Sequence, residues 1–262
     1  MRSPLPLKTL FGWGGVLLFG LALAAKGVGI APPRYEFFLA PGERRSGVFH
    51  VFTTETQAQG VEMELLDYIQ AGDGKFVFLP GGSIPYSLAP YLTVSLNPFE
   101  VAAGKNQTIP FTVTAPKNGE GSYWVAIAFT TRQVRETNAQ GVQITQQVRV
   151  LGAVYVTITG TERPNASLET LKVEGSKLTA TVANTGNTYL RLKPVILLKN
   201  QSGQTIYQKE EEPFLLLREA RIRRSWPLPE ALLGEAVVAA VELRAAPPIP
   251  LPATPYMEAP LQ

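Results

Sequence analysis

The chain has 262 residues, of which 45% are hydrophobic and 17% charged, and it contains no cysteine. This composition is typical of a folded globular protein, and the length allows a leader and two domains of roughly 100 residues each. The lack of cysteine excludes disulfides, thiolate metal sites and cysteine nucleophiles. Two of the 24 basic residues, Arg2 and Lys8, lie in the leader, so the remainder is near neutrality and offers no broad basic surface for nucleic acid.

The N-terminus has the three-part layout of a secretory signal peptide. Arg2 and Lys8 precede an apolar run at residues 10–23, and Ala22 and Ala24 supply the small residues of a cleavage site. The run is shorter than the ~20 apolar residues of a spanning helix and is interrupted by glycines. We therefore expect residues 1–24 to be a signal peptide and the mature chain to act outside the cytoplasm without a membrane span. An uncleaved N-terminal anchor is the alternative.

After the leader, short runs of alternating apolar and polar side chains are separated by turn formers. The first runs fall at residues 35–39, 48–53, 61–68 and 76–79, and residues 89–131 continue the pattern most clearly. Side chains two apart share one face of a strand, so the pattern predicts half-buried antiparallel strands. Turn signals about every 8–12 residues are typical of an immunoglobulin-like β-sandwich.

The first domain is predicted to end with a loop and one long strand. Residues 132–140 are polar and predict the loop. Residues 142–159 form the longest predicted strand, with Gly152 as a bend or bulge. Domain one is therefore predicted over residues 30–159.

A second immunoglobulin-like sandwich is predicted over residues 166–245, after a linker at residues 160–164. Pro194 lies inside one of its strands and predicts an edge strand or a bulge there. Residues 246–262 contain six prolines and predict an extended, polyproline-like tail. The predicted fold class is therefore all-β, with two tandem sandwiches after the signal peptide.

Few side chains suggest catalysis or metal binding. His50 is the only histidine and stands inside a strand, where we expect it to be partly buried, and Trp124 is expected in the core of domain one. No phosphate loop, nucleophile elbow, zinc spacing or calcium loop is present. Arg221 and Arg223 share a strand face, which we interpret as a solvated face and not as an anion clamp. We predict no enzymatic activity, no catalytic residue, no metal and no cofactor.

Four segments, in this order, resemble the periplasmic pilus-assembly chaperones. They are PPRYEFFLAPGE, SLAPYLTVSLNPFEVAAGKNQTIPFTV, PKNGEGSYWVAIAF and QQVRVLGAVYVTI, and a second sandwich with NTGN follows them. The resemblance is best in domain one. It implies a noncatalytic periplasmic protein with two immunoglobulin-like domains, which binds secreted subunits such as pilins by adding one of its strands to the subunit's sheet.

The resemblance also implies where a client would bind. It places the donor strand within residues 142–156, with Val148, Val150 and Val154 as client-binding side chains. It further implies a basic pair, in the cleft between the domains, that holds the client's terminal carboxylate. Arg34 matches one member, and Arg149 stands where the family has a lysine in the last strand.

Two other functions remain open. A structural or adhesive module of the cell envelope would bind cell-wall polymer or a surface protein through its loops and use the proline-rich tail as a spacer. A carbohydrate-active enzyme would need two suitably spaced carboxylates. Glu62 and Glu64 share a strand face at roughly 6–7 Å, but no other residues mark a cleft around them.

Overall fold

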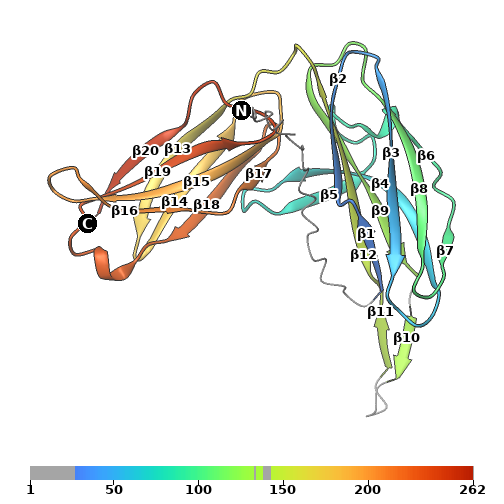
Figure 1. Ribbon diagram of the computed structural model, residues 1–262. Helices are drawn as coiled ribbons and strands as arrows, with labels where there is room; N and C mark the ends of the chain where they lie inside the picture. The colour runs from blue at the N-terminus through green and yellow to red at the C-terminus, as the bar shows by residue number, and fades with distance from the viewer. Residues whose placement is uncertain (1–26, 133, 138–142, 262) are drawn as a thin grey trace, which may run out of the picture.

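The computed structural model describes residues 27–132, 134–137 and 143–261, so the predicted signal peptide lies outside the described residues. The strands form two β-sandwiches, one over residues 28–158 and the other over residues 166–260 (Figure 1). The predicted fold class, all-β with two immunoglobulin-like domains, is confirmed. In the part of the chain that the structure describes, no helix is long and apolar enough to cross a membrane.

Domain one consists of two facing sheets and a separate hairpin. Its strands are β1 (Val28–Ala31), β2 (Arg34–Leu39), β3 (Arg44–Thr53), β4 (Gln59–Gln70), β5 (Phe76–Pro80), β6 (Leu92–Val94), β7 (Phe99–Val101), β8 (Asn106–Thr114), β9 (Gly121–Thr131), β10 (Val134–Thr137), β11 (Gln143–Gln146) and β12 (Arg149–Ile158). The first sheet has the order β1-β3-β8-β6. The second has the order β2-β12-β9-β4-β5, with β7 also paired to β4.

The alternation along β9 determines what lies on each face of the second sheet. Val125, Ile127 and Phe129 point into the sandwich and pack with Phe49 of the first sheet in one buried cluster. Trp124 points the other way, yet none of its surface is exposed. Tyr86 covers it with a ring centroid 4.6 Å away, and its indole N–H donates to the Tyr68 carbonyl at 2.9 Å. The prediction of a buried Trp124 is confirmed, but on the outer face of the sheet.

Two predictions for the end of domain one are wrong. The segment predicted as a loop contains β10, which pairs antiparallel with β11. The predicted long strand is consequently two strands, β11 and β12, interrupted at Gln147 and Val148, where the Thr131 hydroxyl accepts a hydrogen bond from the Val148 N–H at 2.9 Å. The hairpin projects from the sandwich (Figure 1), and the mostly polar sequence of β10 did not predict a strand.

Gly152 is not a bend or bulge, because β12 pairs with β9 in continuous register from Arg149 to Ile158. A Cβ atom at this position would lie 2.8 Å from the ring of Phe49. The glycine therefore makes room for an aromatic side chain of the facing sheet within a regular strand.

Domain two also has two sheets. Its strands are β13 (Ala166–Glu174), β14 (Lys177–Asn184), β15 (Leu190–Lys199), β16 (Thr205–Glu210), β17 (Phe214–Leu216), β18 (Arg221–Pro227), β19 (Val238–Ala246) and β20 (Tyr256–Pro260). One sheet has the order β13-β14-β18. The other has the order β16-β15-β19-β20, with β17 paired to β15.

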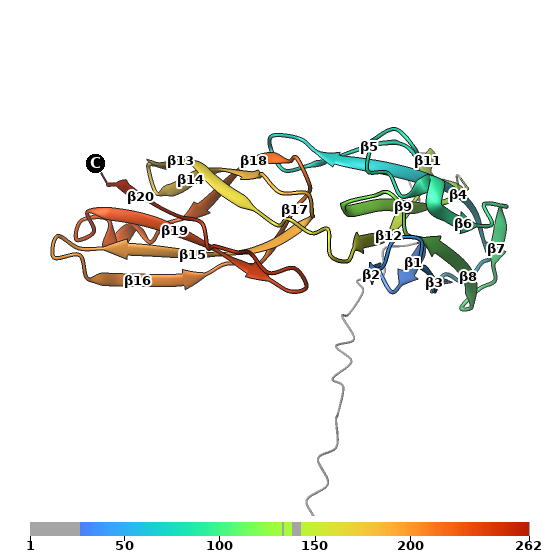
Figure 2. The ribbon, with the colours of Figure 1, turned by 90° about the horizontal axis from the view of Figure 1, so that it is seen from above.

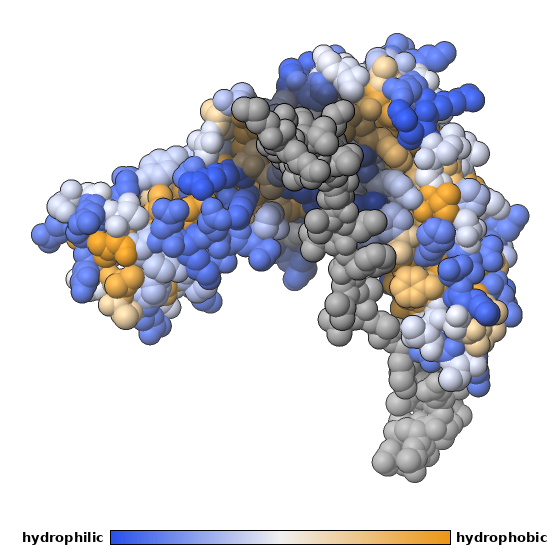
Figure 3. All heavy atoms as spheres, in the orientation of Figure 1, coloured by the Kyte–Doolittle hydropathy of each residue, from blue (hydrophilic) through white to orange (hydrophobic). Residues whose placement is uncertain are grey.

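On the face of the molecule in view in Figure 3, the surface is mostly hydrophilic, and apolar side chains form separate small groups.

The predicted extended tail also needs correction, because β19 runs to Ala246 and residues 256–260 form β20, paired antiparallel with β19. Ile249, between these strands, is buried at 3% exposure, and Ala259 is buried as well. Lys199 donates to Glu258 at 2.5 Å across the sheet. The prolines are therefore concentrated in the connection to an edge strand, where a missing N–H is tolerated.

Pro194 lies in a strand that is not at the edge, since β15 is flanked by β19 on one side and by β16 and β17 on the other. The Pro194 carbonyl accepts from the Glu211 N–H at 2.9 Å, between the ends of β16 and β17. In an antiparallel pair the nitrogen and carbonyl of one residue face the same neighbour. The proline nitrogen therefore faces the break between two partner strands, where its missing hydrogen leaves the ladder intact.

Candidate functional site

The edge of the second sheet of domain one is only partly covered. β12 pairs with β9 along its whole length, but β2 pairs with it in parallel only from Ala153 onward. Successive residues of β12 direct their main-chain N–H and C=O groups to opposite sides of the strand. The Val148 carbonyl accepts from the Thr131 N–H of β9, whereas the Ala153 N–H, on the other side, donates to the Pro33 carbonyl at 3.1 Å. The N–H and C=O groups of Arg149 and Leu151 therefore face the uncovered side. No described strand pairs with this side at residues 149–152.

The side chains on β12 divide between the two faces of the sheet. Val154 is fully buried in the core of domain one, so the prediction that its side chain contacts a client is wrong. Val150 is half-buried against the same core, and Val148 is half-buried just before the strand begins. Leu151 and Arg149 point outward, and Arg149 forms an ion pair with Glu64 at 3.0 Å.

Arg149 does not join Arg34, the other basic residue that the sequence singled out. Arg34 pairs in register with Ala153, four residues beyond Arg149 and therefore roughly 13 Å further along the strand. The basic residue that does lie beside Arg34 comes from domain two. Arg191 of β15 approaches Glu36 Oε1 at 2.5 Å, and Arg34 contacts the same oxygen at 2.8 Å.

Arg191 was missed because its sequence position is ordinary. It alternates with Leu190 and Leu192 as any outward-facing residue of a strand does. Its side chain is nevertheless only 18% exposed, and its Nε is buried without a hydrogen-bond partner among the described residues. Only the arrangement of the two domains brings it to Arg34.

Beside the two arginines lies a cavity of about 230 Å³ between the domains. Tyr68 of β4 and Phe76 and Phe78 of β5 supply aromatic walls, and Leu151 of β12 and Leu215 of β17 add apolar surface. The ring centroids of Phe76 and Phe78 lie 5.5 and 5.8 Å from that of Tyr68. The cavity therefore combines an apolar lining with a cationic rim.

The floor of the cleft is neutral. The Tyr68 hydroxyl donates to the Tyr155 hydroxyl at 2.6 Å, and the rings of Tyr155 and Tyr189 lie 4.7 Å apart. Burial raises the pKa of Tyr68, Tyr155 and Tyr189 above the ordinary value of 10. All three hydroxyls therefore stay protonated at neutral pH, and the charge of the cleft comes from Arg34, Arg191 and Glu36.

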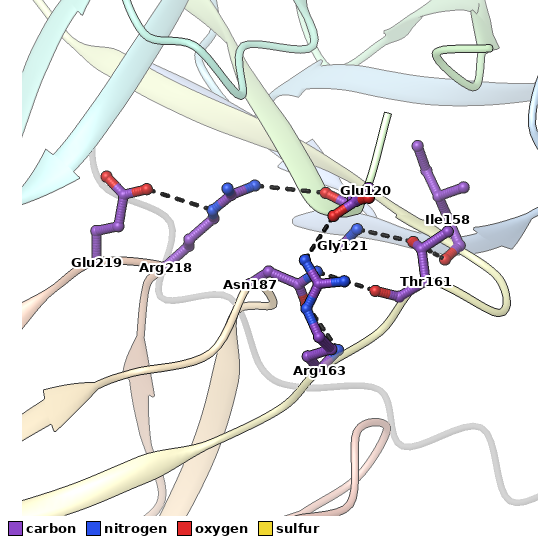
Figure 4. Close-up of polar contacts among 8 residues, drawn as sticks. All are labelled: Glu120, Gly121, Ile158, Thr161, Arg163, Asn187, Arg218 and Glu219. Atoms are coloured by element: carbon purple, nitrogen blue, oxygen red, sulfur yellow. Dashed lines mark hydrogen bonds and ion pairs between the residues drawn. The ribbon is translucent and has the colours of Figure 1, made fainter. Parts of the chain in front are cut away.

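A polar network around Asn187 fixes one side of the domain junction (Figure 4). The Asn187 side chain accepts from the Arg163 N–H at 2.7 Å and donates to the Thr161 carbonyl at 2.9 Å. Its main-chain carbonyl accepts from the Ser122 N–H at 3.0 Å. Asn187 belongs to domain two, Ser122 to domain one, and the other two partners to the linker, so this single residue connects all three.

The same junction requires a glycine at position 121. Gly121 has a φ of +69°, and a Cβ atom there would lie 2.1 Å from the Asn187 carbonyl oxygen. Next to it, Glu120 forms an ion pair with Arg163 at 2.5 Å, and its carbonyl accepts from Arg218 at 3.4 Å (Figure 4). The turn before β9 is therefore held against domain two by contacts on both sides of the linker.

The β4–β5 hairpin forms a second connection and reaches across to β17 and β18 (Figure 2). The Gln70 side chain donates to the Leu215 carbonyl at 2.9 Å and accepts from the Leu217 N–H at 2.7 Å. At the hairpin turn, the Gly72 carbonyl accepts from the Arg223 N–H at 2.7 Å. We call this hairpin, residues 70–76, the arm.

The other candidate residues have structural surroundings. His50 is exposed on β3, which corrects the expectation of partial burial. Arg221 and Arg223 form exposed ion pairs with Glu169 and Glu174, as a solvated strand face would. Glu62 and Glu64 are both exposed on β4. The described residues contain no group of three or more side chains arranged to hold a metal ion.

No family model matches the chain, and no curated protein sequence matches it. Solved structures of fimbrial chaperones are similar to it. The class 5 fimbriae chaperone CfaA is 13% identical, with a TM-score of 0.49 over 88% of this chain and 98% of its own. A chain of the CsuC–CsuE chaperone–tip adhesion subunit complex of Acinetobacter baumannii is 9% identical, with a TM-score of 0.49 over 88% and 97%. A chain of the Salmonella enterica SafA pilin–SafB chaperone complex is 12% identical, with a TM-score of 0.45 over 91% and 99%.

Proposed function

We propose that this protein is a noncatalytic periplasmic chaperone of the pilus-assembly type, which binds secreted subunits by adding its β12 edge to the subunit's sheet. One observation carries the proposal: an open main-chain edge at residues 149–152 ends beside Arg34 in the cleft between the domains. Exposed strand edges favour pairing with another chain, and proteins usually cover them. An edge left open next to a cationic cleft is suited to a binding role.

Main-chain groups supply the first part of the interaction. The outward N–H and C=O groups of Arg149 and Leu151 pair with an extended segment of the client, as in other cases of β-strand addition. This pairing is independent of the client's sequence. Val148 and Val150, together with the β11 segment that precedes them, are proposed to contact the client's apolar groove.

The position of Arg34 determines the direction of the client segment. β12 runs toward the cleft, and Arg34 lies at the end where β2 takes over the edge. A client whose terminal carboxylate reaches Arg34 must therefore run parallel to β12. Guanidinium–carboxylate pairs of this kind combine charge with two parallel hydrogen bonds, which would set the register of the added strand.

An adhesive module with a proline-rich spacer has less support, because the predicted spacer contains β20. The glycosidase alternative would depend on Glu62 and Glu64, which are exposed on one strand, and Glu64 forms an ion pair with Arg149.

The decisive experiment separates the main chain of β12 from its side chains. Leu151→Pro removes one outward N–H without breaking the ladder to β9, whereas Leu151→Ala keeps the N–H and removes the side chain. Each full-length variant is tagged, produced in the organism of origin and recovered from the compartment to which it is exported. The exported subunit that binds the wild type is then quantified by mass spectrometry. We expect Leu151→Pro to lose the subunit and Leu151→Ala, which only trims one wall of the cavity, to recover clearly more of it. Equal recovery with both variants would refute strand addition at this edge.

A further inference from the structure

We infer that the cavity beside Arg34 and Arg191 selects clients by their last residue, and that it accepts a terminal carboxylate together with a large apolar, preferably aromatic, side chain. This inference rests on the proposed function and specifies the chemistry of the client's terminus. The site is built by both domains. Arg191 and Leu215 are register partners on β15 and β17, whereas Arg34, Phe76 and Phe78 belong to domain one.

The charges at the rim favour one added anion. Arg34 and Arg191 share a single carboxylate oxygen, Oε1 of Glu36, so two cations face one anion. The Nε of Arg191 is buried and lacks a hydrogen-bond partner among the described residues. Arg191 lines the cavity, so a carboxylate bound there would place a second anion beside the two guanidinium groups.

The lining of the cavity favours an apolar side chain. Phe76 and Phe78 are 43% and 41% exposed, which leaves two large aromatic faces open to solvent beside the arginines. Exposed apolar surface of this kind often marks an interaction site. The volume of about 230 Å³ exceeds the ~150 Å³ of an engineered apolar cavity that binds benzene, so an aromatic ring fits.

Basic terminal side chains are disfavoured in the same space. No described residue of the lining is acidic. A lysine side chain would meet Arg34 and Arg191, which carry the same charge. Burial of an unpaired polar or charged group is unfavourable, so the cavity should reject such clients.

The test uses the full-length protein and fluorescein-labelled peptides of alternating valine and threonine that differ only in the last residue: phenylalanine, alanine or lysine. The phenylalanine peptide is also made with a C-terminal amide. Affinities are measured by fluorescence anisotropy. We expect the phenylalanine peptide to bind on the order of tenfold more tightly than the alanine peptide, because burial of its ring removes apolar surface from water. The amide and the lysine peptide should each bind at least several-fold more weakly than the phenylalanine acid.

Matched variants assign the preference to the cavity. Phe78→Ala should bring the affinities of the phenylalanine and alanine peptides close together, whereas Val77→Ala, on the same strand, equally exposed and outside the cavity lining, should leave their ratio unchanged. Ala153→Leu, which fills the cavity from β12, should act like Phe78→Ala. Arg191→Gln should remove the advantage of the free acid over the amide. Circular dichroism melts confirm that each variant is folded.

The outcomes separate the inference from the proposed function. Equal binding of the phenylalanine and alanine peptides, or a preference that survives both Phe78→Ala and Ala153→Leu, would overturn the inference while strand addition stands. Failure of every peptide to bind would contradict both.

Discussion

The first prediction concerns Asn187 at the domain junction. Its side chain is buried and makes two hydrogen bonds to the linker. Asn187→Ala removes both and leaves the Arg163 N–H and the Thr161 carbonyl without these partners. Each such loss typically costs about 1–3 kcal/mol, and because both hydrogen bonds are only part-buried we expect the free energy of unfolding to fall by roughly 2–4 kcal/mol. For an m value of roughly 2–3 kcal/mol/M, the urea midpoint should fall by about 1 M.

The assay is urea unfolding followed by far-UV circular dichroism, and Asn165→Ala is the control. The Asn165 amide donates to the Thr185 hydroxyl at 2.8 Å, but this pair is exposed, so its loss should cost less than about 1 kcal/mol. If the midpoints of the two variants coincide, the Asn187 side chain does not hold the junction and the reasoning is refuted.

Three further predictions concern single side chains. Trp124→Ala should destabilise the protein by about 3–5 kcal/mol, because it empties a fully buried site, and a melting temperature equal to that of the wild type would contradict this. Gly152→Ala should cost about 1–3 kcal/mol through the 2.8 Å ring contact, whereas Gly72→Ala, with open space around its Cβ, should melt nearly as the wild type does. Hydrogen bonds from Lys199 and Tyr256 lower the pKa of Glu258 below its ordinary 4.5, so this carboxylate stabilises the fold above about pH 4.5 and the contribution is lost as the pH falls through the lower folded-state pKa. The melting temperature of Glu258→Gln should therefore fall less steeply below pH 4.5 than that of the wild type, and parallel curves would disprove the linkage.

The fold could be predicted because local alternation records which face of a strand is buried. The alternation of Val125 and Ile127 with Trp124 and Ala126 is the alternation of core and outer face in β9. The alternation does not show which residues pack over the outer face of the sheet. Trp124 therefore looked like part of the sandwich interior, although Tyr86 buries it from the other side.

The candidate site was predictable only where one strand carries it. Arg34 could be found because it begins a recognisable strand, whereas Arg191 reaches it from a different domain, 157 positions along the chain. Val150 and Val154 lie on the same face of β12, so the sequence pattern does not distinguish them. Val154 is fully buried and Val150 half-buried because the core of the sandwich ends between them. The prolines after Ala246 predicted an extended tail and so concealed β20. An edge strand can nevertheless form in a proline-rich segment, because it needs few of its own N–H groups for pairing.

The arm has a consequence for how the cleft can work. A hinge motion that widened the space between the domains would have to break the hydrogen bonds that Gln70 and Gly72 make with domain two, in addition to those of Asn187. Since the arm also carries Phe76 to the cavity, the proposed binding site for a client's terminus would already be formed before a client binds. Binding of a terminus that fits this site would then cost little conformational entropy of the protein. A terminus that does not fit would not induce another shape of the site, so it would bind weakly.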